Sequence, residues 1–474
     1  MNSDIKFGTD GWRAIIAEDF TFANVRRAAQ GIASFLLANG LQHSVQVVGY
    51  DTRFASADFA RAAAEVLAGN HIPVVLSDRA VPTPVVSWSV VSQSAAGGIV
   101  ITASHNPSSW SGLKYKSRDG ASAPVETVSE LEQRIQSVSP PDIRQLEIKP
   151  AVSQGLVRFQ DFRPAYLAQI NKMLDLSSIK SAGFKIAADS MHGAGAGYYK
   201  MLLDGGASDI LEINAEANPN FPGMKQPEPI GINLGRLSFA VKETGASVGL
   251  ANDGDADRLG LMDEHGNFLN QLQVYSLLAL YLLEVRGLRG PIVRTITSSS
   301  MLNKLGDLYG VPVFEVPVGF KYVAPVMRRE NALVGGEESG GYGYRGHLPE
   351  RDGILSGLFF LDFMASTEKT PSELLDYLFS KVGPHYYDRL DCVFDAARRP
   401  AIVARIEQAH PTEICGKAVA KKDAMDGYRF ILTDGSWLLI RFSGTEPLLR
   451  IYSEAGTQDE VKMLLEYGRA LAGI

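Results

Sequence analysis

The chain has 474 residues, which is too many for one compact core, because domains usually hold roughly 100 to 200 residues, and we expect three or four of them. Hydrophobic residues make up 45% of the chain and charged residues 21%, and no apolar run is long enough to span a bilayer, which excludes a membrane protein. The formal net charge of -7 argues against a surface for nucleic acid or acidic membrane, so an anionic ligand would need a local group of cations or amides.

The N-terminus and the cysteines bear on the compartment of the cell. The first residues lack the basic start and apolar core of a secretion signal. The two cysteines, Cys392 and Cys415, form no CxxC motif and have no nearby histidine pair, which argues against zinc. So few thiols in a long chain are typical of a reducing compartment. We therefore expect a cytoplasmic protein.

The first block of the chain, residues 1–150, alternates short apolar runs with amphipathic stretches. The expected elements are a helix over 22–37 capped by Thr21, a strand over 45–49, a helix over 56–68, and strands over 74–76 and 98–102. This alternation predicts an α/β sandwich. The Ser- and Pro-rich stretch 137–155 indicates its end.

Two further α/β blocks and a different C-terminal lobe follow, with expected bounds 151–260, 261–375 and 376–474. The expected elements are strands over 184–189 and 246–251 in the second block, a strand over 291–293, a helix over 301–309 and a strand over 332–334 in the third, and in the last lobe a hairpin over 428–440 about Asp434-Gly435, a strand over 449–452 and a closing helix from Asp459. The fold class predicted is α/β with four domains, three similar sandwiches and a smaller C-terminal α+β domain.

The sequence ITASHNPSSW at 101–110 places polar residues where a buried strand should end. A plain turn needs Asn106 and Pro107 but does not need Ser104. Ser104 and His105 are therefore candidates for chemistry at the end of this strand.

An acidic loop follows the expected strand over 246–251. Asp253, Asp255 and Asp257 stand at every second position, so their oxygens can converge on a hard cation such as magnesium, calcium or manganese. A calcium-binding hand is excluded because Arg258 occupies the sixth position, where that loop needs glycine. Arg258 beside a cation indicates that an anion, naturally a phosphate, must fit as well. The alternative is an acidic, solvated turn.

Two more loops could bind a sugar phosphate. Glu337 and Ser339, in the glycine-rich stretch 335–341, could pair with vicinal hydroxyls, although such a loop is as often an ordinary turn. Arg441 and Arg450 flank Ser443-Gly444-Thr445, whose successive amides could form an anion-binding concavity. The alternative there is a surface hairpin with a salt bridge.

The motifs taken together resemble the α-D-phosphohexomutases. The resemblance rests on TASHNP at 102–107, DGDADR at 253–258, GEESG at 336–340, RFSGTEP at 441–447 and the opening FGTDGWR at 7–13. It covers essentially the whole chain and implies four domains around a central cleft.

The resemblance also implies a mechanism. Ser104 would carry a phosphoryl group, and Mg2+ would be held by Asp253, Asp255, Asp257 and the phosphoserine, which brings about -1.5 to -2 charges. The phosphoryl group would pass to a hexose monophosphate, giving a hexose 1,6-bisphosphate that reorients and returns its other phosphate to Ser104. The phosphate then moves between C1 and C6.

By the same resemblance the other site residues receive roles. Glu337 and Ser339 would bind the sugar ring. Lys114 and Arg13, which could otherwise be ordinary surface residues, match family positions near the transfer point, where a base must take the proton of the attacking hydroxyl; an arginine is a poor proton acceptor and would stabilise charge instead. Arg258 would also lie near the transferred phosphate, and His105 would orient the serine loop, since neighbouring side chains seldom form a hydrolase-type pair. The second phosphate site would comprise Arg441, Ser443, Gly444, Thr445 and Arg450.

Two departures from the family concern Ser111-Gly112, where Asn-Gly is common before the lysine, and Gly341, where some mannose-active members have histidine; His347 is the candidate to compensate for the second. The stretch Gly319-Phe320-Lys321 is similar to glucose- and mannose-phosphate members, so Lys321 would contact substrate. The expected function is a phosphoglucomutase or phosphomannomutase. The alternatives are a phosphoglucosamine mutase, a phosphosugar-binding protein without turnover and a phosphatase. The expected partner is a small hexose phosphate, with neither nucleic acid nor membrane, and the expected state is a monomer or homodimer.

Overall fold

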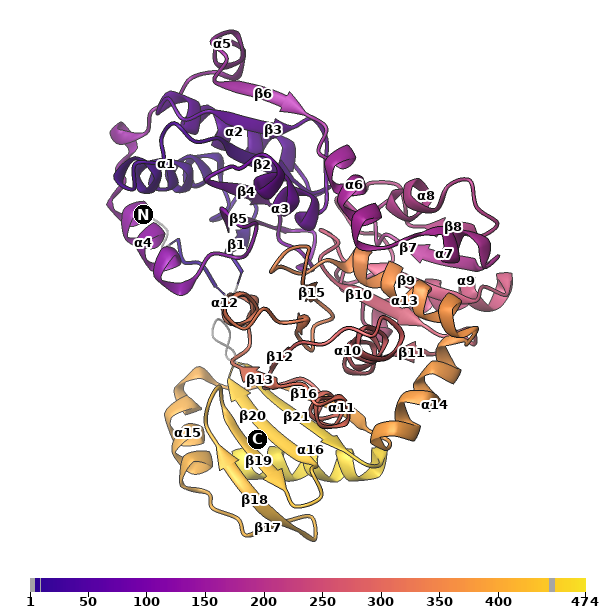
Figure 1. The fold of residues 1–474 in the computed structure, drawn as a ribbon. Helices are drawn as coiled ribbons and strands as arrows, with labels where there is room; N and C mark the ends of the chain where they lie inside the picture. The colour runs from indigo at the N-terminus through magenta and orange to yellow at the C-terminus, as the bar shows by residue number, and fades with distance from the viewer. Residues whose placement is uncertain (1–4, 9, 443–447) are drawn as a thin grey trace.

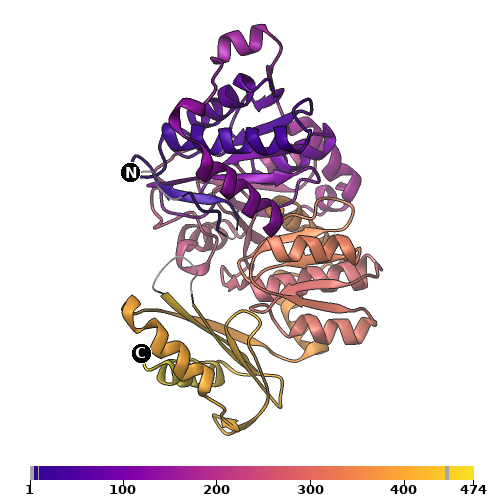
Figure 2. The same cartoon turned by 90° about the vertical axis from the view of Figure 1, so that its left-hand side faces the viewer.

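The computed structural model describes residues 5–8, 10–442 and 448–474. The chain forms four sheets, one after another along the sequence, so that the N-terminal part lies at the top of Figure 1 and the C-terminal part at the bottom. Figure 2 shows the C-terminal domain set below the rest of the molecule. In the described ranges no helix has both the length and the apolar character needed to cross a membrane.

The first sheet has six strands and is covered by helices on both faces. Alternate residues of β2 face opposite cores: Val47 packs in the core shared with the central domains, and Val48 packs in the core under α1 and α2. The strand order is β1 (Trp12–Ile15), β5 (Trp110–Ser117), β4 (Gly97–Ile101), β2 (Gln46–Tyr50), β3 (Val74–Ser77) and β6 (Val157–Gln160). The helices are α1 (Phe22–Ala38), α2 (Ser56–Gly69), α3 (Thr83–Ser92), α4 (Val125–Ser137) and α5 (Ile148–Ser153).

The predicted elements of this block are present, with the cap expected at Thr21, whose side chain accepts a hydrogen bond from the Asn24 amide. The sheet itself runs past residue 150, because β6 pairs in parallel with β3. The sequence stretch that forms β6 is half exposed at the sheet edge and therefore lacks the apolar run of a central strand.

The second and third sheets are smaller and contain both parallel and antiparallel strand pairs. The second has the order β11 (Phe268–Leu269), β10 (Leu259–Met262), β9 (Val248–Asn252), β7 (Lys185–Asp189) and β8 (Asp209–Ile213), and the third has β13 (Val313–Val316), β12 (Ile292–Thr295), β14 (Val334–Gly336) and β15 (Tyr342–Tyr344). Their helices are α6 (Arg163–Met173), α7 (Ser177–Ser181), α8 (Tyr198–Leu203), α9 (Gly235–Thr244), α10 (Gln271–Leu280), which runs into a π-helical turn (Tyr281–Val285), α11 (Met301–Tyr309), α12 (Phe320–Arg329), α13 (Gly353–Thr367) and α14 (Pro371–Val382).

The C-terminal sheet is antiparallel and differs from the other three. Its order is β16 (Tyr386–Val393), β21 (Leu448–Ala455), β20 (Trp437–Phe442), β19 (Tyr428–Leu432), β18 (Lys417–Asp423) and β17 (Glu413–Ile414), and its helices are α15 (Arg399–Gln408) and α16 (Gln458–Ala472). Leu438 and Ile440 pack with these helices, whereas Trp437 and Leu439 pack with Ile296 of the third domain. The predicted fold class, three α/β sandwiches and a C-terminal α+β domain, is confirmed.

Three loops follow the carboxyl ends of central strands, which is where open α/β sheets hold ligands. Ser104 follows β4, Asp253 follows β9 and Glu337 follows β14. Helix α13 fixes two of these regions together, because the Gly353 amide donates to the Ala256 carbonyl oxygen and the Asp352 amide to that of Tyr342.

We predict that Gly353→Ala destabilises the protein. A Cβ at Gly353 would lie 2.2 Å from the Arg258 carbonyl oxygen and 2.6 Å from the side-chain Nδ2 of Asn252, and the backbone of Arg258 cannot move aside as a flexible side chain could. We expect a loss of about 2–3 kcal/mol in the free energy of unfolding, measured by urea denaturation. The matched control is Gly235→Ala at the start of α9, where a Cβ would meet no atom within 4 Å and stability should be unchanged or slightly raised. Equal stabilities for the two variants would contradict this packing argument.

Candidate active site

Ser104 lies in a tightly held loop at the end of β4. Its backbone has a φ of 52°, a left-handed conformation that non-glycine residues seldom adopt, and the residue is buried. The guanidinium of Arg53 donates hydrogen bonds to the carbonyl oxygens of Ser104 (2.7 Å), Asn106 (2.6 Å), Pro107 (2.9 Å) and Trp110 (2.9 Å). The surrounding loop therefore stabilises a strained serine, as is common where a side chain must be presented for chemistry.

The Ser104 hydroxyl points at the acidic loop of the second domain. It donates a hydrogen bond to Asp253 Oδ2 at 2.7 Å, and His105 Nδ1 lies 3.3 Å from the Ser104 Oγ. Burial, followed by the cations Arg258 and Arg13, lowers the pKa of His105 well below its usual value. His105 is therefore a neutral imidazole beside the serine.

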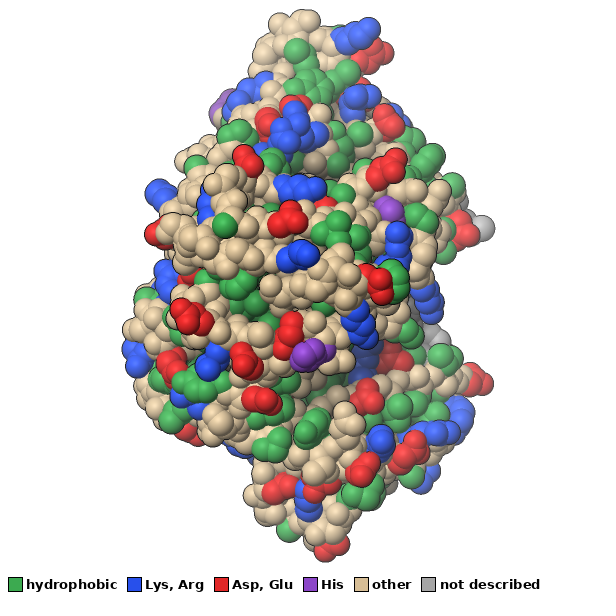
Figure 3. Space-filling view, turned by 90° about the vertical axis from the view of Figure 1, so that its right-hand side faces the viewer, with side chains coloured by type: hydrophobic (Ala, Val, Ile, Leu, Met, Phe, Trp, Pro, Cys, Tyr) green, Lys and Arg blue, Asp and Glu red, His purple; other side chains and the backbone are tan. Residues whose placement is uncertain are grey.

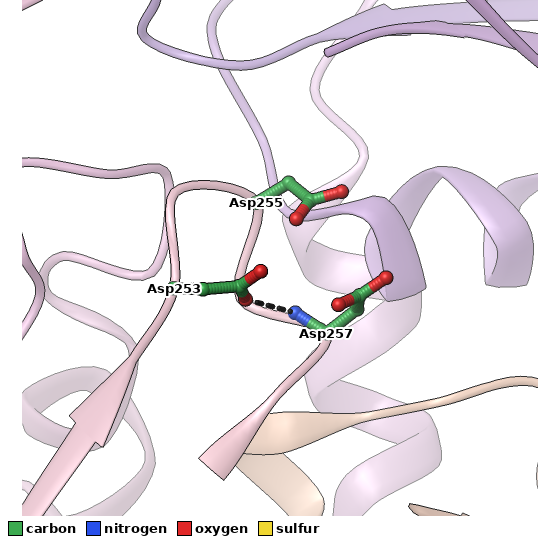
Figure 4. Close-up of side chains that lie close together, drawn as sticks. All are labelled: Asp253, Asp255 and Asp257. Atoms are coloured by element: carbon green, nitrogen blue, oxygen red, sulfur yellow. Dashed lines mark hydrogen bonds between the residues drawn. The ribbon is translucent and has the colours of Figure 1, made fainter. Parts of the chain in front are cut away.

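Asp253, Asp255 and Asp257 form a buried carboxylate cluster. Figure 4 shows the three side chains on one loop, with Asp253 accepting a hydrogen bond from the Asp257 amide at 3.0 Å. One oxygen of each residue lies within 4.8 Å of the others, and all three residues are fully buried. Burial excludes the alternative of a solvated acidic turn.

The cluster has the features of a cation site. Burial, then the charges of Asp255 and Asp257, raises the pKa of Asp253 well above its usual value. Asp255 Oδ1 and Asp257 Oδ1 are buried and have no hydrogen-bond partner among the residues that the structure describes. Buried carboxylate oxygens that converge without donors fit a hard divalent cation such as Mg2+, which takes oxygen ligands.

Cations of the first and second domains surround the cluster. Lys114 Nζ lies 2.9 Å from Asp255 Oδ2, 3.2 Å from Asp257 Oδ2 and 2.8 Å from Asp10 Oδ2. Burial lowers the pKa of Lys114, but the three carboxylates outweigh it and hold the pKa above its usual value. Arg258 Nε lies 4.0 Å from Asp253 and 3.9 Å from Asp257.

Arg13 also reaches the serine loop, where its Nη1 donates to Asn106 Oδ1 at 2.7 Å. The structure thus brings together Ser104, His105, Arg13 and Lys114 of the first domain with the acidic loop of the second. Lys114 and Arg13 are not ordinary surface residues.

Arg351 is a central residue that the sequence analysis missed. It is buried, its Nη2 contacts Asp10 and lies 3.0 Å from Asp257 Oδ2, and its Nη1 lies 3.5 Å from Glu337 Oε2. One guanidinium thus joins the first, second and third domains. Its stretch, LPERDG, contains no feature that distinguishes it from a surface loop. The available signal lies on another element: Lys114 and Lys116 are two residues apart on one strand, so they face the same side, and carboxylates must lie opposite them.

The glycine-rich loop of the third domain carries Glu337 and Ser339 beside this network. Glu337 is buried, and burial, partly offset by Arg351, raises its pKa to about 7. The loop is tied to the second domain because the Leu259 amide donates to the Gly340 carbonyl oxygen at 2.9 Å. Ser339 lies on the same turn and is partly buried.

The fourth domain contributes two arginines on neighbouring strands. Arg441 on β20 pairs in register with Arg450 on β21, and Arg441 Nε lies 2.9 Å from Asp426 Oδ1. Ser443, Gly444 and Thr445 lie outside the described residues. Lys321, at the start of α12, donates from Nζ to the Gly8 carbonyl oxygen at 3.4 Å, which joins the third domain to the N-terminal segment.

His347, the candidate to compensate for the histidine that some members have after the sugar loop, lies in a packed environment. Its side chain is fully buried, its ring stacks on Trp88 at 5.6 Å, and its Nε2 lies 2.9 Å from Asp352 Oδ2. The histidine therefore belongs to the packed contact between the first and third domains, and its part in proton transfer stays a prediction.

Comparisons with known proteins agree with this architecture. Models of the phosphoglucomutase/phosphomannomutase α/β/α domains I, II and III match residues 4–141, 164–266 and 270–382, and the model of the C-terminal domain matches residues 398–467. A solved structure, a putative phosphomannomutase from Thermus thermophilus, is 36% identical, with a TM-score of 0.88 and full coverage of both chains.

Two curated relatives span nearly the whole chain. The phosphoglucomutase/phosphomannomutase of Thermococcus kodakarensis is 32% identical over 98% of this chain and 97% of its own. The phosphoglucosamine/phosphogalactosamine mutase of Sulfurisphaera tokodaii is 29% identical over 97% of each chain.

The fold and the site at the strand ends define an α-D-phosphohexomutase, an isomerase that transfers a phosphoryl group within its substrate. The chain belongs to the phosphoglucomutase/phosphomannomutase family. The predicted resemblance and enzyme class are confirmed.

We predict that the acidic loop binds Mn2+, used as a paramagnetic substitute for Mg2+, and that affinity rises with pH. The sign follows from Asp253, whose raised pKa lets a proton compete with the cation at lower pH. Electron paramagnetic resonance at about pH 6 and about pH 8 should show tighter Mn2+ binding at the higher pH. Asp255→Asn should weaken binding by about 100-fold or more, whereas Asp58→Asn, an exposed control on α2, should not change it. Equal Mn2+ affinities for Asp255→Asn and the wild type would contradict the assignment of a metal site to this loop.

Proposed function

We propose that the protein is a phosphohexomutase that moves a phosphoryl group between the C1 and C6 oxygens of glucose or mannose phosphate, with Ser104 as the phosphoryl carrier. The observation that carries the proposal is the Ser104 hydroxyl, held 2.7 Å from Asp253 beside a triple-carboxylate cluster and the cations Lys114, Arg13 and Arg258. A phosphoryl group on Ser104 would meet positive charge on several sides, which is the environment that phosphoryl transfer needs.

Asp253, Asp255 and Asp257 would hold Mg2+ together with an oxygen of the phosphorylated Ser104. When bound, the ion would act as a Lewis acid that offsets the charge of the phosphoryl oxygens. Asp255 Oδ1 and Asp257 Oδ1 support this assignment, because no donor in the described part of the chain forms a hydrogen bond to either oxygen.

In the proposed reaction, the bond between phosphorus and Ser104 Oγ breaks as a bond forms between phosphorus and the free hydroxyl oxygen of the hexose phosphate. The hydroxyl proton leaves to a nearby base, and a hexose 1,6-bisphosphate results. The bisphosphate then reorients in the site and returns its other phosphoryl group to Ser104 by the reverse step. Lys114, Arg13 and Arg258 would stabilise the transferring oxygens, and neutral His105 would orient the serine loop.

The rest of the substrate would be bound by the third and fourth domains. Glu337 and Ser339 would form hydrogen bonds with hydroxyl groups of the sugar ring in either orientation of the substrate, and Lys321 would contact the substrate. Arg441, Arg450 and the stretch 443–445 would bind the phosphate that is not being transferred. The register of Arg441 against Arg450 supports this role, since two guanidiniums on neighbouring strands match a phosphate group.

The preference for glucose or mannose phosphate rests on the sequence Gly319-Phe320-Lys321 and on relatives such as the Thermococcus kodakarensis enzyme. The second candidate is a phosphoglucosamine mutase, which relatives such as the Sulfurisphaera tokodaii enzyme favour. Assays of glucose, mannose and glucosamine 1-phosphates side by side, with magnesium and catalytic bisphosphate, distinguish the two. Release of inorganic phosphate would instead indicate a phosphatase, and the absence of turnover a binding protein.

We predict that Ser104→Ala abolishes mutase turnover, with kcat lowered by at least about 10³-fold, because the phosphoryl carrier is lost. Circular dichroism and the urea midpoint should stay those of a folded protein. Ser109→Ala, an exposed residue of the same loop, is the matched control and should keep wild-type activity. Retention of most activity by Ser104→Ala would overturn the proposed mechanism.

We predict that KM for the hexose phosphate falls as the pH rises through about 7, the pKa of Glu337, because the ionised carboxylate accepts hydrogen bonds from sugar hydroxyls more strongly than the neutral acid does. Glu337→Gln should raise KM at pH 8 by about tenfold and remove this limb of the profile. Ionisation of the substrate phosphate affects both proteins alike, so the difference between their profiles isolates the carboxyl group. The same limb in both proteins would exclude Glu337 from binding the ring.

A further inference from the structure

A cavity of about 280 Å³ lies where the C-terminal end of α6 meets the third domain, and it shares no residue with the site at the strand ends. Its floor is apolar and includes the buried side chains of Leu282, Leu333, Tyr344 and Phe359. The volume is close to the lower limit of small-molecule sites, which hold ligands between apolar walls and a few polar groups.

Three cations, Lys172, Arg286 and Arg345, line the same cavity. Within the described parts of the chain, no carboxylate oxygen lies within ion-pair distance of any of them. Among the described residues, Arg286 is linked to an acidic group through Tyr281: Arg286 Nη1 donates to the Tyr281 hydroxyl at 3.2 Å, and that hydroxyl donates to Asp362. In a chain with 53 acidic and 46 basic residues, three cations around one cavity without acidic partners indicate an anionic ligand.

The position of Arg286 is fixed before any ligand binds. The residue follows the π-helical turn Tyr281–Val285, a rare form that is frequent at functional sites. Its guanidinium lies 6.0 Å from the ring centre of Tyr281 and 5.9 Å from that of Phe359, and Nη2 donates to the Met173 carbonyl oxygen at 3.4 Å. Arg345 is held likewise, since its Nη2 donates to the Arg289 carbonyl oxygen at 2.9 Å.

We propose that this cavity is a second ligand site, specific for a small aromatic phosphate such as an aryl or nucleoside monophosphate. The phosphate would lie among Lys172, Arg286 and Arg345, because guanidinium groups bind phosphate oxygens in pairs. The ring would lie against the apolar floor that Phe359 and Tyr344 help to form.

Binding there would join two parts of the molecule. Lys172 and Met173 belong to α6, which connects the first sheet to the second domain, whereas Leu333 and Arg345 belong to the third domain. The present contact between these parts includes the hydrogen bond from Gln169 Nε2 to the Gly346 carbonyl oxygen at 3.0 Å. A ligand that touches both sides stabilises their arrangement by mass action and should raise the unfolding temperature by about 2 °C at saturation.

Calorimetry with adenosine 5′-monophosphate and phenyl phosphate tests the proposal on the full-length protein, with inorganic phosphate as the comparison. Glucose 1-phosphate is present at saturation so that it occupies the site at the strand ends and the added phosphates cannot bind there. We expect a Kd below about 1 mM for at least one aromatic phosphate, with inorganic phosphate weaker by about tenfold or more.

Arg286→Met should weaken binding of the aromatic phosphate by about tenfold or more, and Lys172→Met by about threefold. Lys172 is exposed and forms no hydrogen bond or ion pair with the other described residues, so its variant stays informative if Arg286→Met fails to fold. Lys462→Met, an exposed residue on α16, is the charge-matched control and should bind as wild type does.

Three results would overturn the proposal: no binding of either aromatic phosphate, binding that neither cavity variant weakens, or inorganic phosphate that binds as tightly as the aromatic ones. Lys172→Met should keep wild-type mutase activity, because this residue has no part in the proposed reaction. The outcome is therefore independent of whether Ser104 carries a phosphoryl group.

Discussion

The attraction between buried carboxylates of the first and second domains and buried cations of the first and third is the interaction on which the rest of this structure depends. Lys114 forms ion pairs with Asp255 and Asp257, and Arg351 forms ion pairs with Asp257 and Asp10. These groups are almost fully removed from water, so losing one member would leave an uncompensated charge, which costs far more than a surface pair would gain. The network therefore fixes the distance between the serine loop, the acidic loop and the sugar loop.

Close contact between backbones gives the same region its shape. A Cβ at Gly254 would lie 2.6 Å from the Ser104 carbonyl oxygen, and one at Gly193 would lie 2.6 Å from the Gly254 carbonyl oxygen. The serine loop and the acidic loop thus touch through main chain, and the Ser104 hydroxyl donates to Asp253 across this contact. Strain at Ser104 is maintained by this packing and by the four hydrogen bonds from Arg53.

The fourth domain is joined to the third by a mixed interface. Arg429 forms ion pairs with Glu315 and Asp423, and Asp426 accepts a hydrogen bond from the Val318 amide while it pairs with Arg441. Asp426 thereby connects the arginine of the proposed phosphate site to the stretch that precedes Lys321. Figure 3 shows a recess where the C-terminal domain meets the body, and acidic and basic side chains are interspersed over this face, without a broad basic area.

The four-part α/β architecture could be predicted from the sequence, because the periods of 2 and 3.6 residues that mark strands and helices are local properties. Ser104, the three aspartates and Glu337 could be singled out as candidates, because each follows a strand whose apolar run is evident. The sequence did not determine β6, whose edge position removes the apolar pattern, nor the place of His347, which only packing against Trp88 and Asp352 decided. Asp10, Arg53 and Arg351 were likewise set by tertiary structure alone, since a buried cation is recognised by carbonyl and carboxylate oxygens that come from distant parts of the chain. Local residue preferences specify which element forms, but the partner of a buried charge is known only when separate domains are brought together.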